Sequence, residues 1–434
     1  MNIRLYNARI LTMEKNRPVF QGEIWVRNEK ISYIAADDDP ETEEKKKALS
    51  QDSWDMQIDC KGNLLMPGFK NAHTHSGMTF LRSMADDLPL DKWLHERVFP
   101  LEAKLTGDDI YHLSRLAILE YLTSGITSIF DMYLDTDATA QACLDMGMRC
   151  VLASGLNNFT SSVEKLEEGY LKWNQKDSLI SCQLAFHAEY TCSKELLEQV
   201  AGLAHKYKAP VYTHLAETSK EVEACRERYG ATPAVFLDSL GMFDYGGGGY
   251  HCVHMSEEDV GIFRKNKMYV ITNPGSNTKL ASGIAPIAEY VRKKIPVAIG
   301  TDGPASNNCL DMFREMFLVT GLSKLKEMDA ASLDALKVLE MATVNGAKAM
   351  GLTSCDILAE GKMADIIMID LNQPNMQPIH NIPKNLVYSG SKSNVCMTMI
   401  NGRILYQNGE FNVGDSTENI YAKCNQIVKR LLLQ

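Results

Sequence analysis

The strongest constraint on the fold is an alternation of short apolar segments with helical segments through the middle of the chain. One such helix is expected at 108–124, with Thr106 or Asp108 as its cap and Gly125 just beyond its end. Eight strands separated by helices close into a (β/α)₈, or TIM-type, barrel, which predicts an α/β fold. The eight strand candidates are the run that leads into His73 and residues 126–130, 150–153, 181–186, 210–213, 251–253, 268–271 and 296–299.

Both ends of the chain have a β pattern instead. Residues 1–66 contain short alternating runs, and alternation returns at 364–369 and 396–400, where Asn401-Gly402 predicts a hairpin turn. The charged run within 37–52 is expected to be a solvated loop. The predicted division is a small composite β domain from residues 1–66 and 351–415, the metal-dependent barrel at 67–350, and a C-terminal helix at 416–434.

Charge and composition exclude several classes of protein. With 45 basic and 55 acidic residues the net charge is −10, which disfavours nucleic-acid binding and a polybasic membrane patch. We find neither a signal-peptide core nor a run of about 20 apolar residues. The 11 cysteines never form Cys-x-x-Cys, so they are expected to be reduced. These features predict a cytoplasmic protein that binds neither nucleic acid nor a membrane.

Two glycine-containing segments are interpreted as turns. Pro67-Gly68 is a turn signal before the first barrel strand. The run at 246–249 lacks the Gly-Lys-Ser/Thr of a phosphate-binding loop, so we interpret it as a flexible turn into strand six.

Residues that can bind a metal or transfer protons recur where the predicted strands end. In a TIM-type barrel this edge carries the active site. His73 and His75 are two positions apart, so they point to the same side of a strand. Strand six ends near both His251 and His254, and either could be its functional histidine. The remaining candidates are His187 after strand four, His214 and Glu217 after strand five, and Asp302 after strand eight.

The residue types indicate a metal centre. Nitrogen from His73, His75 and His214 and oxygen from Asp302 suit zinc, or ferrous iron, with a position left for water. The metal would lower the pKa of that water to about 7. Asp302 could accept its proton and Glu217 could carry a proton to the substrate. The strand-six histidine could polarise the substrate or orient the hydroxide.

Nearly the whole chain resembles the 5-methylthioadenosine/S-adenosylhomocysteine deaminase family of the amidohydrolase superfamily. The resemblance is carried by residues 67–75, 82–90, 214–218, 251–254, 273–277, 279–286, 300–303, 305–308 and 361–365.

The resemblance implies a role for each matching residue. It implies His73, His75, His214 and Asp302 as ligands of one divalent metal, Glu217 as proton shuttle, and His251 rather than His254 as the strand-six histidine. It also implies that Glu102 holds the ribose hydroxyls, that His187 contacts the purine nucleoside and that Trp93 forms pocket wall. A carboxylate suits a vicinal diol because it accepts two hydrogen bonds. A homo-oligomer is implied as well.

The chain departs from the family pattern after strand three. Some members carry arginines there that would pair with the carboxylate of S-adenosylhomocysteine, whereas residues 152–158 contain none. Lys165 is the first cation after this segment in the sequence, and its position matches that of the family's arginines poorly. The absence of arginine weakens the case for a homocysteine tail, and it leaves substrates with a smaller 5′ group, such as methylthio, hydroxyl or hydrogen, as alternatives.

The predicted activity is hydrolytic deamination of an adenosine-type nucleoside, such as 5-methylthioadenosine, S-adenosylhomocysteine, adenosine or 5′-deoxyadenosine, to its inosine analogue. The alternative is an aminohydrolase or chlorohydrolase of guanine, a pterin or a triazine, and Glu102 argues against it. A catalytically inactive binding protein is disfavoured by the complete set of site residues. A nucleic-acid deaminase is disfavoured because its Pro-Cys-x-x-Cys signature is absent.

Overall fold

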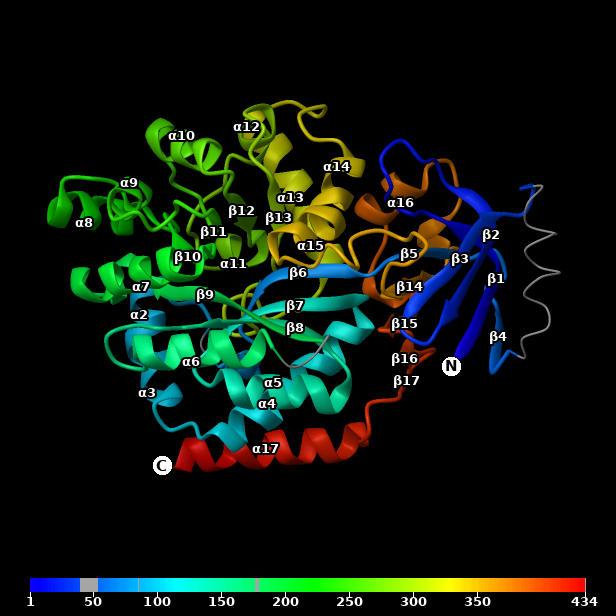
Figure 1. The fold of residues 1–434 in the computed structure, drawn as a ribbon, viewed down its shortest axis with the longest axis horizontal. Coiled ribbons are helices and arrows are strands. Elements are labelled where there is room, and N and C mark those ends of the chain that lie inside the picture. The colour runs from blue at the N-terminus through cyan, green and yellow to red at the C-terminus, as the bar shows by residue number, and fades with distance from the viewer. Residues whose placement is uncertain (40–53, 85, 176–178, 434) are drawn as a thin grey trace.

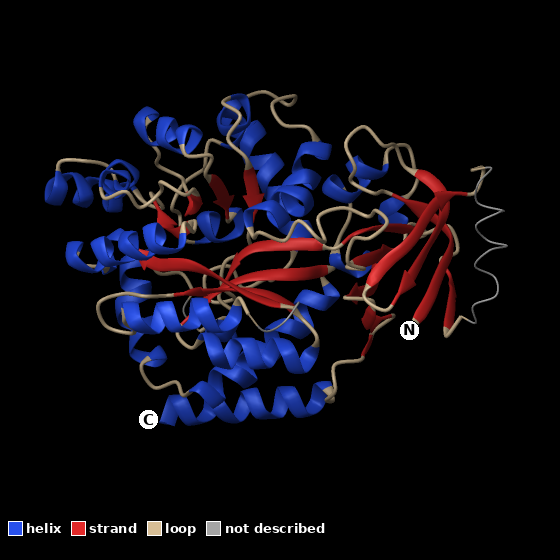
Figure 2. Cartoon of the chain, viewed as in Figure 1, coloured by secondary structure: helices blue, strands red, loops and turns tan. Residues whose placement is uncertain are grey.

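The computed structural model describes residues 1–39, 54–84, 86–175 and 179–433, and it consists of two sheets with their helices (Figures 1 and 2). The charged run expected to be a solvated loop falls almost entirely outside these residues. One sheet has eight strands from the middle of the chain, and the other has nine strands from the two ends. The predicted combination of a TIM-type barrel and a small β domain is confirmed.

The eight-stranded sheet is parallel throughout, in the order β13-β12-β11-β10-β9-β8-β7-β6. Its two ends meet where Asp302 N–H, just after β13, donates to His73 O of β6 at 3.0 Å. The strands are β6 (Phe69–Thr74), β7 (Ile126–Tyr133), β8 (Arg149–Ser154), β9 (Ile180–Ala188), β10 (Val211–Leu215), β11 (Gly247–His251), β12 (Tyr269–Thr272) and β13 (Val297–Ile299).

Helices cover the outside of this barrel (Figure 2). The expected helix is α4 (Gly107–Thr123), and Thr106 caps it in a reciprocal pair of hydrogen bonds with Asp109. The others are α5 (Thr136–Met146), α6 (Val163–Trp173), α7 (Lys194–Tyr207), α8 (Ser219–Tyr229), α9 (Pro233–Ser239), α10 (Glu257–Lys265), α11 (Pro274–Lys279), α12 (Ile287–Arg292), α13 (Met312–Glu327), α14 (Ala335–Glu340) and α15 (Gly346–Ala349).

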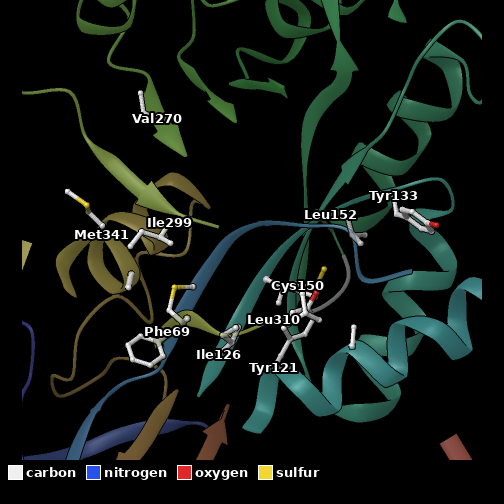
Figure 3. Close-up of a cluster of buried hydrophobic side chains, with 14 of the residues drawn as sticks. Phe69, Tyr121, Ile126, Tyr133, Cys150, Leu152, Val270, Ile299, Leu310 and Met341 are labelled. Atoms are coloured by element: carbon white, nitrogen blue, oxygen red, sulfur yellow. The ribbon is translucent and has the colours of Figure 1, made fainter. Parts of the chain in front are cut away.

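Alternate residues of the barrel strands enter two different apolar clusters, because successive side chains of a strand point to opposite faces. The outer cluster packs under the helices and includes Phe69, Leu152 and Ile299 (Figure 3). Burying these side chains contributes about 25 cal/mol per Å² of apolar surface. Each strand gives at least one residue to the inner cluster: Ala72, Phe130, Met132, Val151, Ala153, Ala185, Tyr212, Tyr250, Ile271 and Ala298.

The glycines expected to form a turn before strand six are part of the strand itself. β11 includes Gly247, Gly248 and Gly249. A Cβ on Gly247 would lie 1.9 Å from the backbone oxygen of Val211, and one on Gly248 would lie 2.9 Å from the Tyr212 ring. The turn prediction was wrong because these glycines serve close approach to β10, which a single sequence does not reveal.

The nine-stranded sheet joins the two ends of the chain, in the order β17-β16-β15-β14-β5-β1-β2-β3 with β4 beside β1. Asn401 and Gly402 have φ of 53° and 73° in the predicted hairpin turn between β15 and β16. The strands are β1 (Asn2–Ile10), β2 (Phe20–Arg27), β3 (Lys30–Ala36), β4 (Met56–Asp59), β5 (Leu64–Pro67), β14 (Ile366–Ile369), β15 (Val395–Ile400), β16 (Arg403–Gln407) and β17 (Glu410–Phe411).

A single residue, Gly68, separates β5 of the terminal sheet from β6 of the barrel. The turn expected at Pro67-Gly68 is therefore wrong, since the chain runs from one strand directly into the next. A Cβ on Gly68 would lie 2.0 Å from the Thr127 side chain, which explains the glycine.

The chain closes with α17 (Thr417–Leu433), which lies along α4 (Figure 1). Arg430 of α17 pairs with Asp109 of α4. The predicted domain boundaries stay a prediction. Within the described residues no helix is both long and apolar enough to cross a bilayer.

Candidate functional site

A pocket with about 740 Å³ of empty space lies at the carboxyl ends of the barrel strands. It brings together residues that lie far apart in the chain, as expected of this edge of a parallel barrel. His73 is fully buried beside it. The predicted site residues that line the pocket are His75, Trp93, Glu102, His187, His214, Glu217, His251 and Asp302.

Three histidines and one aspartate converge on one point of this pocket. The Nε2 atoms of His73 and His214 lie 3.1 Å apart. Asp302 Oδ1 lies 3.2 Å from His75 Nε2 and 3.7 Å from His73 Nε2. Ligand atoms of His73, His75 and His214 all lie within 4.8 Å of one another, and so do those of His73, His251 and Asp302.

The orientation of two of these rings is set by the backbone. His75 Nδ1 donates to Met132 O of β7, and His214 Nδ1 donates to His187 O of β9 at 2.7 Å. A proton on Nδ1 leaves the Nε2 lone pair free in a neutral imidazole. In the neutral form of each ring the Nε2 lone pair therefore faces the shared point.

The protonation of the cluster also suits a cation. Burial, followed by the neighbouring histidines, holds the pKa of His73 and of His214 well below the usual value. Burial alone would raise the pKa of Asp302, but the hydrogen bond from His75 and the other histidines outweigh it, so that this pKa is lowered. Burial would lower the pKa of His75, but the hydrogen bond with Asp302 and its negative charge outweigh burial and raise it. The neutral imidazoles of His73 and His214 and the Asp302 carboxylate are donors typical of a divalent metal site.

Glu217 stands at the pocket wall just after β10. Ala216 has a left-handed φ of 50°, and the N–H groups of Ala216 and Glu217 donate to the Glu221 carboxylate at 2.7 and 2.8 Å. Burial raises the pKa of Glu217, although His251 acts in the opposite direction. A carboxyl group with a raised pKa, held next to a metal site, is suited to take up and release a proton during catalysis.

His251 is the last residue of β11 and has a left-handed φ of 70°. Its Nδ1 lies 2.7 Å from Asn277 Oδ1, to which it can donate, and its Nε2 lies 3.8 Å from Asp302 Oδ2. His254 lies outside this cluster, with its Nε2 2.7 Å from the backbone oxygen of Ser282.

The opposite wall comes from a short helical segment: α2 (Leu90–Lys92), η2 (Trp93–Val98) and α3 (Phe99–Glu102). Burial raises the pKa of Glu102 to about 7. Glu102 Oε1 and Trp93 Nε1 are buried and have no hydrogen-bond partner among the described residues. Buried polar atoms of this kind are normally satisfied, so these two are available to a ligand. His187 lines the same pocket, and its pKa is lowered to about 4, chiefly by burial.

The rest of the lining is predominantly apolar. Of the described residues that line the pocket, none is a lysine or an arginine. Its apolar members are Met78, Leu90, Leu94, Val98, Phe99, Met132, Leu134 and Leu280.

Sequence reasoning missed the residues that support the site by contacting its functional side chains. Glu221 and Asn277 fix Glu217 and His251, as described above. Ser282 donates to Glu217 at 3.2 Å, and the Tyr250 ring stacks on His73 with centroids 3.7 Å apart. The segments 273–277 and 279–286 carried the resemblance, but their polar residues had no visible partner in the sequence.

Comparison with known proteins extends these observations. The sequence pattern that defines the amidohydrolase family matches residues 64–405 of this chain. A 5-methylthioadenosine/S-adenosylhomocysteine deaminase of Thermoanaerobacter pseudethanolicus is 38% identical over 97% of each chain. The crystal structure of an adenosine deaminase from Xanthomonas campestris with bound zinc has a TM-score of 0.92 and 30% identity, over 100% of this chain and 98% of the other. An atrazine chlorohydrolase of Arthrobacter aurescens shares the fold, with a TM-score of 0.87 and 22% identity over 98% and 100%.

Proposed function

We propose, from the premise that this chain belongs to the amidohydrolase family, that it removes the 6-amino group of an adenosine-type nucleoside by hydrolysis. The products are ammonia and the inosine analogue. The observation that carries the proposal is the pocket itself, which combines a histidine and aspartate metal site at its base with a buried carboxylate, Glu102, on its wall. Among the described residues, Oε1 of this carboxylate has no hydrogen-bond partner of good geometry, although Tyr133 lies close enough to lower its pKa. The names of the relatives support the same reaction.

We assign the metal to His73, His75, His214 and Asp302, and we propose zinc, one ion per subunit. The zinc in the adenosine deaminase structure supports this choice over iron. A divalent metal supplies hydroxide at neutral pH by lowering the pKa of a water to about 7.

The protein's own residues handle the protons. The ionised Asp302 carboxylate can accept the proton that the attacking water loses. Glu217, whose pKa is raised by burial, can deliver a proton to N1 of the adenine ring. His251 directs its Nε2 to the same space while Asn277 holds its Nδ1, so in its neutral form it can accept a hydrogen bond from the water and orient it.

The substrate side of the pocket favours a ribose with an uncharged 5′ group. The buried Glu102 carboxylate, whose Oε1 has no hydrogen-bond partner among the described residues, can accept hydrogen bonds from both ribose hydroxyls. Trp93 and His187 line the space for the nucleoside. An amino-acid tail carries a carboxylate, and burying that charge without a cationic partner is costly. The cation-free lining therefore supports 5′-methylthio, hydroxyl or hydrogen over homocysteine.

The test is a substrate panel for the zinc-loaded protein, followed by the adenine-to-hypoxanthine absorbance change. It contains adenosine, 5′-deoxyadenosine, methylthioadenosine, S-adenosylhomocysteine and free adenine. We expect turnover of the nucleosides and little turnover of adenine. If none of the five compounds is turned over, the proposal is overturned. Activity on guanine or a triazine would then support the second candidate, an aminohydrolase or chlorohydrolase of another heterocycle. The similarity in fold to the atrazine chlorohydrolase keeps this candidate open.

A further inference from the structure

The segment that follows β12 reaches the two proton-handling residues of the pocket from behind. It begins in α11 and runs on to Gly283, and two of its polar side chains point at the site. Asn277 Oδ1 lies 2.7 Å from His251 Nδ1, and Ser282 Oγ lies 3.2 Å from Glu217 Oε1. One loop therefore contacts groups that are carried by two other strands, β10 and β11.

Ser282 is held firmly in this position. Its N–H donates to the backbone oxygen of Asn277 at 2.9 Å, and its carbonyl accepts from His254 Nε2 at 2.7 Å. The neighbouring Gly283 has a φ of 128°, and a Cβ there would lie 2.9 Å from Val253. The loop is thus closely packed against the segment after β11, and the backbone that carries the serine hydroxyl is held in place.

The hydroxyl matters because Glu217 has few other constraints. The backbone of Glu217 is fixed through Glu221. Among the described residues, Ser282 is the one whose side chain donates a hydrogen bond to the Glu217 carboxylate. A carboxylate that must deliver a proton to one ring nitrogen needs a defined rotamer, since a misplacement of about 1 Å can cost about 10²-fold in rate. The donated hydrogen bond is made to Oε1 of this carboxylate.

Building on the proposed function, we propose that Ser282 is a positioning residue for Glu217, so that the loop after β12 sets the geometry of proton transfer as well as that of His251. Ser282 does not touch the reacting atoms. Its effect passes through the orientation of the glutamate.

The kinetic test compares Ser282→Ala with Ser282→Thr, which keeps the hydroxyl. We expect Ser282→Ala to lower kcat about tenfold on the preferred nucleoside with KM changed less than twofold, because the interaction acts in the transition state rather than in substrate binding. Ser282→Thr should recover most of the loss. Ser323→Ala, another buried serine, is the matched control and should leave kcat unchanged.

A double variant separates positioning from a general structural effect. In a Glu217→Gln background, Ser282→Ala should lower kcat less than twofold, because the residue through which it acts has already been replaced. A full tenfold loss in both backgrounds would overturn the proposal, and so would a Ser282→Ala enzyme with normal kcat.

A crystal structure of zinc-loaded Ser282→Ala gives a readout that needs no turnover. We expect the Glu217 carboxylate to leave its single wild-type rotamer. An unmoved carboxylate would count against the proposal even if kcat fell. If the wild-type protein deaminates no nucleoside, the proposed function fails, and the structure of the variant still decides the role of Ser282.

Discussion

The Nε2 atoms of His73 and His214 lie 3.1 Å apart, although 141 positions separate the two residues in the chain. Both imidazoles are buried and held neutral, because the pKa of each is well below its usual value. The His214 ring presents an Nε2 lone pair because its Nδ1 proton is donated to a backbone carbonyl. A cation between these nitrogens removes the repulsion of lone pairs that face each other.

Metal content is the first property that this relationship predicts. His214→Ala should retain less than about a tenth of the wild-type zinc after dialysis. Losing a residue that only supports a ligand typically lowers metal affinity about 10- to 100-fold, and losing the ligand itself should cost more. The measurement is the zinc and iron content per chain by mass spectrometry. His205→Ala, which removes an exposed histidine of α7, is the control. Equal zinc in both variants would contradict the assigned ligands.

Metal removal should also lower stability. An ion that binds only the folded chain stabilises it by mass action, so chelation should lower the midpoint of thermal unfolding and added zinc should restore it. The His214→Ala protein should show no such response.

The acidity of Glu102 predicts how ribose recognition depends on pH. Its pKa is raised to about 7 by burial, so the carboxylate that accepts two hydrogen bonds exists above that pH and is lost as the pH falls through it. The ratio of kcat/KM for adenosine to that for 2′,3′-dideoxyadenosine should therefore fall below about pH 7. Using the ratio cancels the titration of groups that serve both substrates.

Replacing Glu102 tests the same interaction. Glu102→Gln should lower kcat/KM for adenosine about 100-fold, given about 1.5–3 kcal/mol for a hydrogen bond to a charged group, and leave dideoxyadenosine unchanged. Glu96→Gln, on the exposed face of η2, is the matched control. An equal loss on both substrates would show that Glu102 does not bind the diol.

The 5′ group should be selected by charge. We expect kcat/KM for methylthioadenosine to exceed that for S-adenosylhomocysteine by at least about 100-fold, because the pocket lining offers the tail carboxylate no cation. Thr160→Arg places a cation at the exposed edge of the pocket lining. It should lower the ratio of kcat/KM for methylthioadenosine to that for S-adenosylhomocysteine about tenfold. Equal rates for both substrates in the wild-type protein would contradict this prediction.

The glycines of β11 should be intolerant of any side chain. Gly247→Ala should lower the free energy of unfolding by about 2–4 kcal/mol, because its Cβ would overlap the Val211 carbonyl and its φ of 136° is strained for alanine. Gly202→Ala in α7 is the control, since a Cβ there meets nothing within 4 Å, and alanine should stabilise that helix by about 0.5–1 kcal/mol. Denaturant titration of both zinc-loaded variants measures the two effects.

Much of the fold could be predicted because its signals are local. Most barrel strands, such as β8 and β12, contain a short apolar run. The cap at Thr106 and the turn at Asn401-Gly402 follow from side-chain and backbone preferences of those residues alone. The convergence of His73, His214 and Asp302 could be expected from one geometric rule, that parallel strands end at the same edge of a barrel.

The errors and omissions concern contacts between distant segments. Gly247 is a turn former by its own preference, and only the approach of Val211 explains its place in a strand. Asn277 and Ser282 look like ordinary loop residues until β10 and β11 bring Glu217 and His251 beside them. Such pairings depend on how loops fold over the barrel, and periodicity carries no information about that.

The direct passage from β5 to β6 through Gly68 has a consequence for biosynthesis. β5 pairs with β1 on one side and with β14, near the other end of the chain, on its second side. While the ribosome is still making the barrel, the strand that leads directly to His73 and His75 has an open edge. That edge is closed only after residue 369 has left the exit tunnel, so the nascent chain must be kept from pairing with other chains for most of its synthesis.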